Sequence, residues 1–357
     1  MSASNVNRTS SLISTKYMLI SLGLSVIGMA VVIWWTYSPG VLDHLRLKRM
    51  PGLVLAVAVT LLRVVFVAAK IRFLAEGALS WMASFRVALT WDFASAVTPS
   101  TIGGAPVATY AMSREGIKLG KSTAIILYGV LLDQFWYAVA VPILLIGGIW
   151  LDVIPPEIGF IGSFTMMLIY AGLLLYGAVL AYGLLVNPTF FKRLVHLLFR
   201  IPLLSKYRRR AADEAQTLES YSYELKKKSA SFILKAFTLS TMAWLARVAV
   251  PVIVILSLLP ADEVMLVFRS LAMNLASLVI PTPGGSGGVE GLFAIFLGPL
   301  IERTAFIGLA VFLWRVITYY ISIGLGVIAT TWYVNHKMEE ITSRSDDERE
   351  EVPEMEH

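Results

Sequence analysis

Three ionisable residues lie deep inside apolar stretches of the sequence: Asp133, Arg247 and Arg315. On membrane-insertion scales a charged side chain at the centre of a spanning helix costs ~2.5–3.5 kcal/mol. We therefore expect each of them to face the interior of a helix bundle and to have a partner there. Two guanidinium groups can bind a phosphate head group, and a carboxylate beside them can tune them or hold a proton or cation. The alternative is a static ion pair that only holds helices together.

Tyrosines at helical spacing extend this set of polar residues. Tyr137 follows Asp133 by one turn, and Tyr319 and Ser322 lie on the same helical face as Arg315. Tyr137 and Tyr319 are therefore candidate substrate-binding residues together with the three charges.

The elements that must position these residues are membrane-spanning helices. The chain of 357 residues is 57% hydrophobic and 15% charged, which leaves too few polar groups to cover a water-soluble fold. The sequence predicts an all-α polytopic membrane protein, with one transmembrane domain over 1–334 and an acidic, disordered cytoplasmic tail over 335–357. A span needs about 20 apolar residues. About six full spans meet this length, at 17–36, 51–70, 122–150, 162–186, 231–259 and 304–334.

Two residue types are absent from these stretches. The chain has no cysteine, which excludes disulfides, thiolate nucleophiles and cysteine metal sites. Its four histidines lie outside the apolar cores: His44, His196, His336 and His357. We therefore expect no metal, no cofactor and no histidine base inside the membrane.

Two further apolar stretches, 84–112 and 264–299, are interrupted in the middle by proline and glycine. The interrupting residues are Pro99, Gly103 and Gly104 in the first stretch, and Pro281, Pro283, Gly284, Gly285, Ser286 and Gly287 in the second. Proline lacks an N–H and glycine resists ordering, so neither stretch can be one continuous helix. Irregular backbone at membrane depth is tolerated only inside protein or beside a wet cavity. The sequence predicts a re-entrant helical hairpin at each stretch, with these residues at its tip.

The two hairpins also resemble each other. The segment from Asp92 to Pro99 aligns with the segment from Asn274 to Pro281, 182 positions later, with Ala, Ser, Val and Pro in register. Chance similarity is the alternative, because alanine and serine are common in packed membrane helices. The same offset relates Asp133 to Arg315.

This alignment defines a repeat of span, hairpin and span. The first copy covers about 51–150 and the second about 231–334, and segment 162–186 serves as the connector that inverts the second copy.

Basic residues in the joints give the orientation. The amphipathic segment 187–230 is rich in Lys and Arg and is expected on the cytoplasmic side, whereas joints 151–161 and 260–263 carry only acidic charges. Both termini are then cytoplasmic, and the two hairpins enter from opposite sides. One joint disagrees, because Arg46, Lys48 and Arg49 would be external.

The hairpins carry polar residues of their own. Asp92 and Asn274 precede the breaks, where half-helix termini suit an anion, and Glu290 follows the second glycine cluster. Glu290 either satisfies free amides there or acts as a simple helix cap. Six basic residues near span ends are interpreted as snorkelling to head groups: Arg63, Lys70, Arg72, Arg86, Arg114 and Arg269.

Inverted repeats with broken helices are the architecture of secondary transporters. A membrane enzyme or a transferase subunit acting on lipid-linked substrates is one alternative, and a scaffold without transport is another. The sequence Gly284-Gly-Ser-Gly287 also matches a motif of intramembrane serine proteases, but no span holds a histidine base. The expected partners are membrane lipids, chiefly anionic, with a homodimer as an open option and no nucleic acid.

The hairpin residues, above all Pro281-Thr-Pro-Gly-Gly-Ser-Gly-Gly-Val-Glu290-Gly, resemble the lysylphosphatidylglycerol synthase transmembrane family. This family includes the flippase domain of MprF and the YbhN-like proteins, and the likeness extends from about 17 to 334. The resemblance implies a flippase-like transporter of an anionic phospholipid or related polar lipid in the cell membrane. Only about 20 residues follow the last span, so no aminoacyl-transferase domain and no synthesis of aminoacyl lipids are expected.

Overall fold

The computed structural model describes residues 15–36, 50–98, 104–151, 153–199 and 208–333. These residues are helical, with no strand among them. The helices are α1 (Thr15–Thr36), α2 (Met50–Leu74), α3 (Trp81–Val97), α4 (Gly104–Arg114), α5 (Leu119–Trp150), α6 (Gly159–Ala181), α7 (Thr189–Leu198), α8 (Arg208–Lys226), α9 (Ala230–Leu258), α10 (Glu263–Ala276), α11 (Gly288–Leu297) and α12 (Ala305–Arg315). The predicted tail at 335–357 and the joint that holds Arg46, Lys48 and Arg49 lie outside the described residues.

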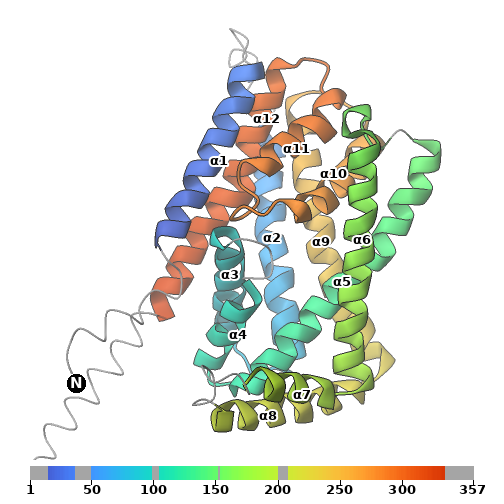
Figure 1. The fold of residues 1–357 in the computed structure, drawn as a ribbon. Helices are drawn as coiled ribbons and strands as arrows, with labels where there is room; N and C mark the ends of the chain where they lie inside the picture. The colour runs from blue at the N-terminus through green and yellow to red at the C-terminus, as the bar shows by residue number, and fades with distance from the viewer. Residues whose placement is uncertain (1–14, 37–49, 99–103, 152, 200–207, 334–357) are drawn as a thin grey trace, which may run out of the picture.

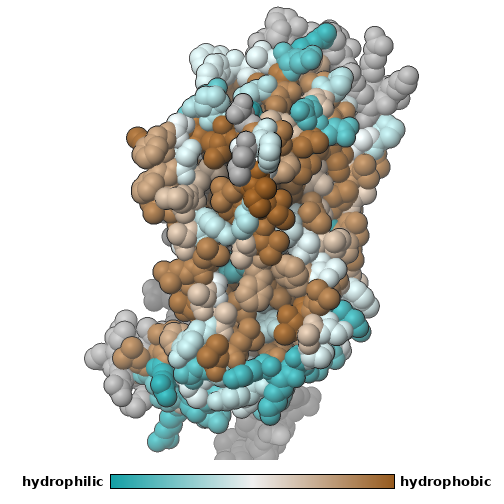
Figure 2. All heavy atoms as spheres, turned by 90° about the vertical axis from the view of Figure 1, so that its right-hand side faces the viewer, coloured by the Kyte–Doolittle hydropathy of each residue, from teal (hydrophilic) through white to brown (hydrophobic). Residues whose placement is uncertain are grey.

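Among the residues that the structure describes, five helical segments are long and apolar enough to cross a membrane. They are Met50–Leu74, Leu119–Gly148, Pro156–Val186, Ala230–Leu258 and Ala305–Tyr333. The sixth expected span, at 17–36, coincides with helix α1, which has 22 residues and contains the apolar stretch Leu22–Thr36. Figure 2 shows apolar residues over the side of the bundle and hydrophilic residues gathered at its two ends. The chain is therefore a multi-pass membrane protein.

The two interrupted stretches form helical hairpins that enter the bundle from opposite ends (Figure 1). The pair α3–α4 rises from the end where α7 and α8 lie, and the pair α10–α11 descends from the other end. Both hairpins begin with a capped helix. Ser80 accepts a hydrogen bond from the Ala83 amide at 3.1 Å, and Asp262 accepts one from Met265 at 3.0 Å. Ser80 and Asp262 are separated by the same 182 positions as Asp92 and Asn274, so these caps agree with the predicted repeat.

The packing of the outer helices repeats as well. In the first half α5 packs against α6, and in the second half α12 packs against α1 (Figure 1). Helices α2 and α9 pack against each other. These contacts place α1 beside the end of one predicted copy and α6 beside the end of the other. The repeat over about 51–150 and 231–334, with 162–186 as its connector, stays a prediction.

Helices α7 and α8 have no counterpart in the described part of the first half, and they lie across one end of the bundle (Figure 1). Tyr221 of α8 fixes this platform to the end of α2. Burial raises the pKa of Tyr221, so its hydroxyl stays protonated and donates to the Leu74 carbonyl at 2.7 Å. Lys228 pairs with Glu76 at 2.6 Å on the same side. The predicted amphipathic segment 187–230 is therefore two helices, docked against the first half.

Candidate functional site

Arg315 is a buried cation at the point where α12 changes its helical form. Arg315 is the last residue of the regular helix. The π-helical turn Val316–Tyr320 follows it, and such turns are often found at functional sites. Only 4% of Arg315 is exposed. Its Nε donates to Glu290 Oε1 at 2.8 Å, and its guanidinium lies 4.6 Å from the ring centre of Tyr319. The Nη2 atom is buried without a hydrogen-bond partner, so one donor of Arg315 stays available.

Glu290 connects this arginine to the second hairpin and to α1. The carboxylate is fully buried; Oε2 accepts the Gly287 amide at 2.9 Å, and Oε1 also accepts the Ser25 hydroxyl at 2.9 Å. Glu290 therefore caps the start of α11, as one interpretation of the sequence predicts, and in addition pairs with Arg315. Ser25 was not among the predicted site residues, because a serine in an apolar helix carries no sequence signal of its own.

The tip of the second hairpin reaches the end of the first. Ser286 is buried and donates to the Tyr319 hydroxyl at 3.1 Å. Gly284 has a φ of +59°, and a Cβ added there would lie 2.7 Å from the Ala96 carbonyl of α3. The glycine thus allows two backbones to approach closely. Pro281, Pro283, Gly285 and Gly287 belong to the same tip. In the first tip Gly104 opens α4, while Pro99 and Gly103 lie outside the described residues.

Arg247 lies in the middle of the long helix α9 and yet is exposed. Its Nε donates to the Asn274 side-chain oxygen at 3.2 Å, and Asn274 in turn donates to the Ser270 carbonyl at 2.9 Å. Arg63 and Arg315 repel Arg247, whereas Asp92 attracts it. These charges come from α2, α12 and α3, so the guanidinium faces the interior. We call Arg63, Asp92, Arg247, Asn274, Glu290 and Arg315 the polar centre.

Arg63 occupies the matching place in the first half. Its guanidinium binds both carboxylate oxygens of Asp92, with Nη1 3.3 Å from Oδ1 and a shorter contact from Nη2 to Oδ2. The snorkelling interpretation of Arg63 is therefore wrong. A signal was present in the sequence, because Arg63 precedes Asp92 by about the same distance as Arg247 precedes Asn274.

Asp133 is bound by a different cluster, between α2, α5 and α9. Its Oδ1 accepts Lys70 Nζ at 2.8 Å, Trp244 Nε1 at 3.0 Å and the Ser240 hydroxyl. Lys70 is 3% exposed, so it does not snorkel either. The buried Tyr137 packs edge-on against Trp244, with ring centres 4.8 Å apart. Asp133 thus pairs with Lys70, and its expected role in tuning the arginines stays a prediction.

The other basic residues near span ends also have protein contacts. Arg86 binds Glu115 through two hydrogen bonds of 2.8 Å and lies 3.7 Å from the ring centre of Trp332. The buried Arg269 donates to the Phe296 carbonyl at 3.3 Å. Arg72 lies 5.2 Å from the ring centre of Trp81, while Arg114 ends α4. Snorkelling is therefore the wrong description of Arg86 and Arg269, because packing within the bundle satisfies them.

Comparison with known proteins places this arrangement in a family. The family model described as "Lysylphosphatidylglycerol synthase TM region" matches residues 18–326. A curated relative, a "UPF0104 membrane protein" of Archaeoglobus fulgidus, is 27% identical over 263 residues, which cover 71% of this chain and 77% of the relative. No solved structure matches the chain. With the family model covering most of the sequence, the chain belongs to the lysylphosphatidylglycerol synthase transmembrane-region family.

Proposed function

We propose that this protein is a flippase-like transporter that moves an anionic phospholipid or a related polar lipid between the two leaflets of the cell membrane. The observation that carries this proposal is the surplus of guanidinium donors in the polar centre. Arg315 keeps a buried Nη2 without a partner, and Arg247 is exposed and donates its hydrogen bond to a neutral amide, with no carboxylate paired to it among the described residues. A phosphate supplies the acceptors that these donors lack.

Physical chemistry favours a phosphate over a static role for these arginines. A buried donor without a partner costs roughly 1–3 kcal/mol, and a bound anion would remove this cost. Repulsion among Arg63, Arg247 and Arg315 would also fall when a negative head group enters. The acyl chains would stay in the surrounding bilayer, because the head group alone requires the polar centre.

In this proposal the two hairpins give the polar centre access from both sides of the membrane. They enter from opposite ends and meet where Gly284 approaches Ala96. In transporters built from inverted repeats, rocking of one half against the other exposes a central site alternately to each side. The basic residues of α7 and α8 favour the cytoplasmic side for this platform and hence for both chain termini.

Reconstitution into liposomes tests the proposal. A lipid with a labelled head group is added, and a membrane-impermeant quencher reports how fast the label changes leaflet. We expect Arg247→Gln to slow this movement about tenfold or more, because a hydrogen bond to a charged group contributes ~1.5–3 kcal/mol. Arg209→Gln, which removes an exposed arginine of α8, serves as the control and should leave the rate unchanged.

Two outcomes of this experiment would reject the proposal. If Arg247→Gln moves lipid as fast as the unchanged protein, the polar centre does not hold the head group. If the labelled lipid is chemically converted, the protein is a membrane enzyme acting on lipids, which is the alternative that the sequence leaves open.

A further inference from the structure

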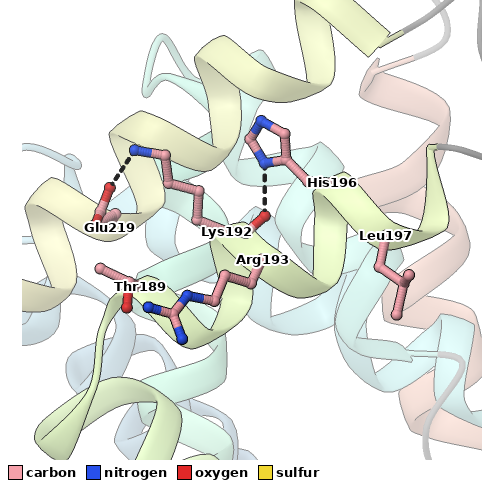
Figure 3. Close-up of a pocket in the computed structure, with 6 residues that line it drawn as sticks. All are labelled: Thr189, Lys192, Arg193, His196, Leu197 and Glu219. Atoms are coloured by element: carbon pink, nitrogen blue, oxygen red, sulfur yellow. Dashed lines mark hydrogen bonds and ion pairs between the residues drawn. The ribbon is translucent and has the colours of Figure 1, made fainter.

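A polar cavity lies at the end of the bundle, between α7 and α8. It encloses about 530 Å³. The lining residues, shown in Figure 3, are Thr189, Lys192, Arg193, His196, Leu197 and Glu219. Three of these six side chains are basic or can become cationic, and one is acidic. The cavity is therefore a candidate binding site for an anion, separate from the polar centre.

The charges in this cavity are not equally available. Lys192 pairs with Glu219 at 2.8 Å and donates to the Gln216 side chain at 2.7 Å, so its charge is already used. His196 Nδ1 lies 2.8 Å from the Lys192 carbonyl and therefore donates to it, which leaves Nε2 for the cavity.

Arg193 is the cation of this cavity that none of these contacts neutralises. It is exposed and has no hydrogen-bond or ion-pair partner among the residues that the structure describes. Figure 3 shows its guanidinium extending toward Thr189, while His196 projects from another side of α7. Arg193 is thus the group most suited to bind an incoming anion, because its planar fork of N–H donors matches a phosphate.

Apolar side chains lie uncovered next to this cation. Leu194 is 40% exposed and Leu197 is 61% exposed, whereas Phe190 and Phe191 pack against Tyr182 and Gly183 at the end of α6. The first turn of α7 is therefore anchored to the bundle through its aromatic residues, while the two leucines further along the helix stay open beside Arg193. A ligand that combines an anionic group with an apolar chain fits both features.

We propose that the α7–α8 cavity is a discrete binding site for an anionic phospholipid of the adjacent leaflet. Arg193 binds the phosphate, and Leu194 and Leu197 contact an acyl chain. Helix α7 lies across the end of the bundle (Figure 1). An amphipathic helix in such a position is expected to lie where lipid head groups meet water. This site holds a lipid in place and lies outside the path through the polar centre, so it does not depend on the proposed transport.

Photolabelling of the full chain in detergent micelles tests this site. The probe is a short-chain phosphatidic acid with a photoreactive group in its acyl chain, and mass spectrometry maps the labelled peptide. We expect label on the segment that contains Leu194 and Leu197. Arg193→Gln should reduce it about fivefold, the factor that corresponds to ~1 kcal/mol per basic residue near a membrane surface. Arg209→Gln, with the same change in net charge, should retain it.

Three results would overturn the proposal. Equal loss of label in Arg193→Gln and Arg209→Gln would show diffuse attraction without a site. Equal labelling by a matched phosphatidylcholine probe would show that the anionic charge is not recognised. Loss of label with millimolar glycerol 3-phosphate would show that the cavity binds a soluble phosphate ester instead of a lipid. Because the label is read on α7 alone, a failure here leaves the transport assay and its outcome untouched.

Discussion

The two halves of the polar centre use the same arrangement with different charges. In the first half Arg63 of α2 binds the carboxylate of Asp92, and in the second half Arg247 of α9 binds the neutral amide of Asn274. The first pair is therefore neutral, whereas the second keeps a positive charge. The difference teaches that two similar frames can differ in charge: with an amide in place of a carboxylate, the second frame leaves its cation without a counter-charge.

A second contrast concerns the two buried ion pairs. Lys70 binds Asp133 and lies 3.3 Å from the Ser240 oxygen, whereas Arg315 binds Glu290 through Nε and leaves Nη2 unused. An ammonium group can point all its donors at one cluster, but a guanidinium has donors on two edges. The second half thus holds both sets of N–H donors that are available to a ligand, those of Arg247 and of Arg315 Nη2. Ligand binding is therefore expected in the second half, and structural support in the first.

The largest effect should follow from breaking the Arg315–Glu290 pair. Arg315→Leu leaves the carboxylate of Glu290 buried and unpaired, which should cost ~3–5 kcal/mol of stability and abolish transport. Thermal unfolding in detergent measures the first effect and the liposome assay the second. The double variant Arg315→Leu with Glu290→Leu removes the unpaired charge and should recover most of the stability. Transport by this double variant would show that Arg315 is only structural.

Exchanging the amide and the carboxylate sharpens the comparison between the halves. Asn274→Asp gives Arg247 a full counter-charge, as Asp92 gives Arg63, and should slow transport of anionic lipid about tenfold, equivalent to ~1.4 kcal/mol. Thermal unfolding should change little, because the new pair copies one that the fold already holds. The reciprocal variant Asp92→Asn should keep most of the transport rate. If both exchanges slow transport equally, the two halves hold the head group together.

The smallest effect is expected at the hairpin tip. Gly284→Ala places a Cβ 2.7 Å from the Ala96 carbonyl and 2.9 Å from the Tyr319 ring, and it also strains a positive φ. Gly77→Ala is the matched control, since its φ of +77° is also positive and its Cβ would meet nothing within 4 Å. The difference in unfolding free energy between the two variants isolates the contact between hairpins and should be ~1 kcal/mol. Equal losses would mean that the tips tolerate separation.

Much of the fold could be predicted because its signals are local. Proline and glycine mark the two hairpins, and the alignment of Asp92 with Asn274 predicts the repeat before any contact is known. The burial and pairing of Arg315 also agree with the cost of a charge in mid-membrane. Helices α5 and α6 each begin three residues before the predicted spans at 122–150 and 162–186.

The partners of the charges could not be predicted, because they lie on other helices. Arg63 and Lys70 look like span-end residues in the sequence, and only the packing of α2 against α3, α5 and α9 directs them inward. Ser25 is a similar case, since its role depends on the approach of α1 to Glu290. Periodicity gives the face of a helix but not the neighbour that this face meets.

The platform of α7 and α8 gives the molecule a polarity that duplication alone cannot provide. Two identical halves related by a two-fold axis in the membrane plane would present the same energy barriers to cargo arriving from above or below. A docked layer at one end, tied to α2 through Tyr221, removes that equivalence. Any difference between the two directions of lipid movement can therefore arise from this layer as well as from the unequal charges of Asp92 and Asn274, and deleting α7 and α8 separates the two sources.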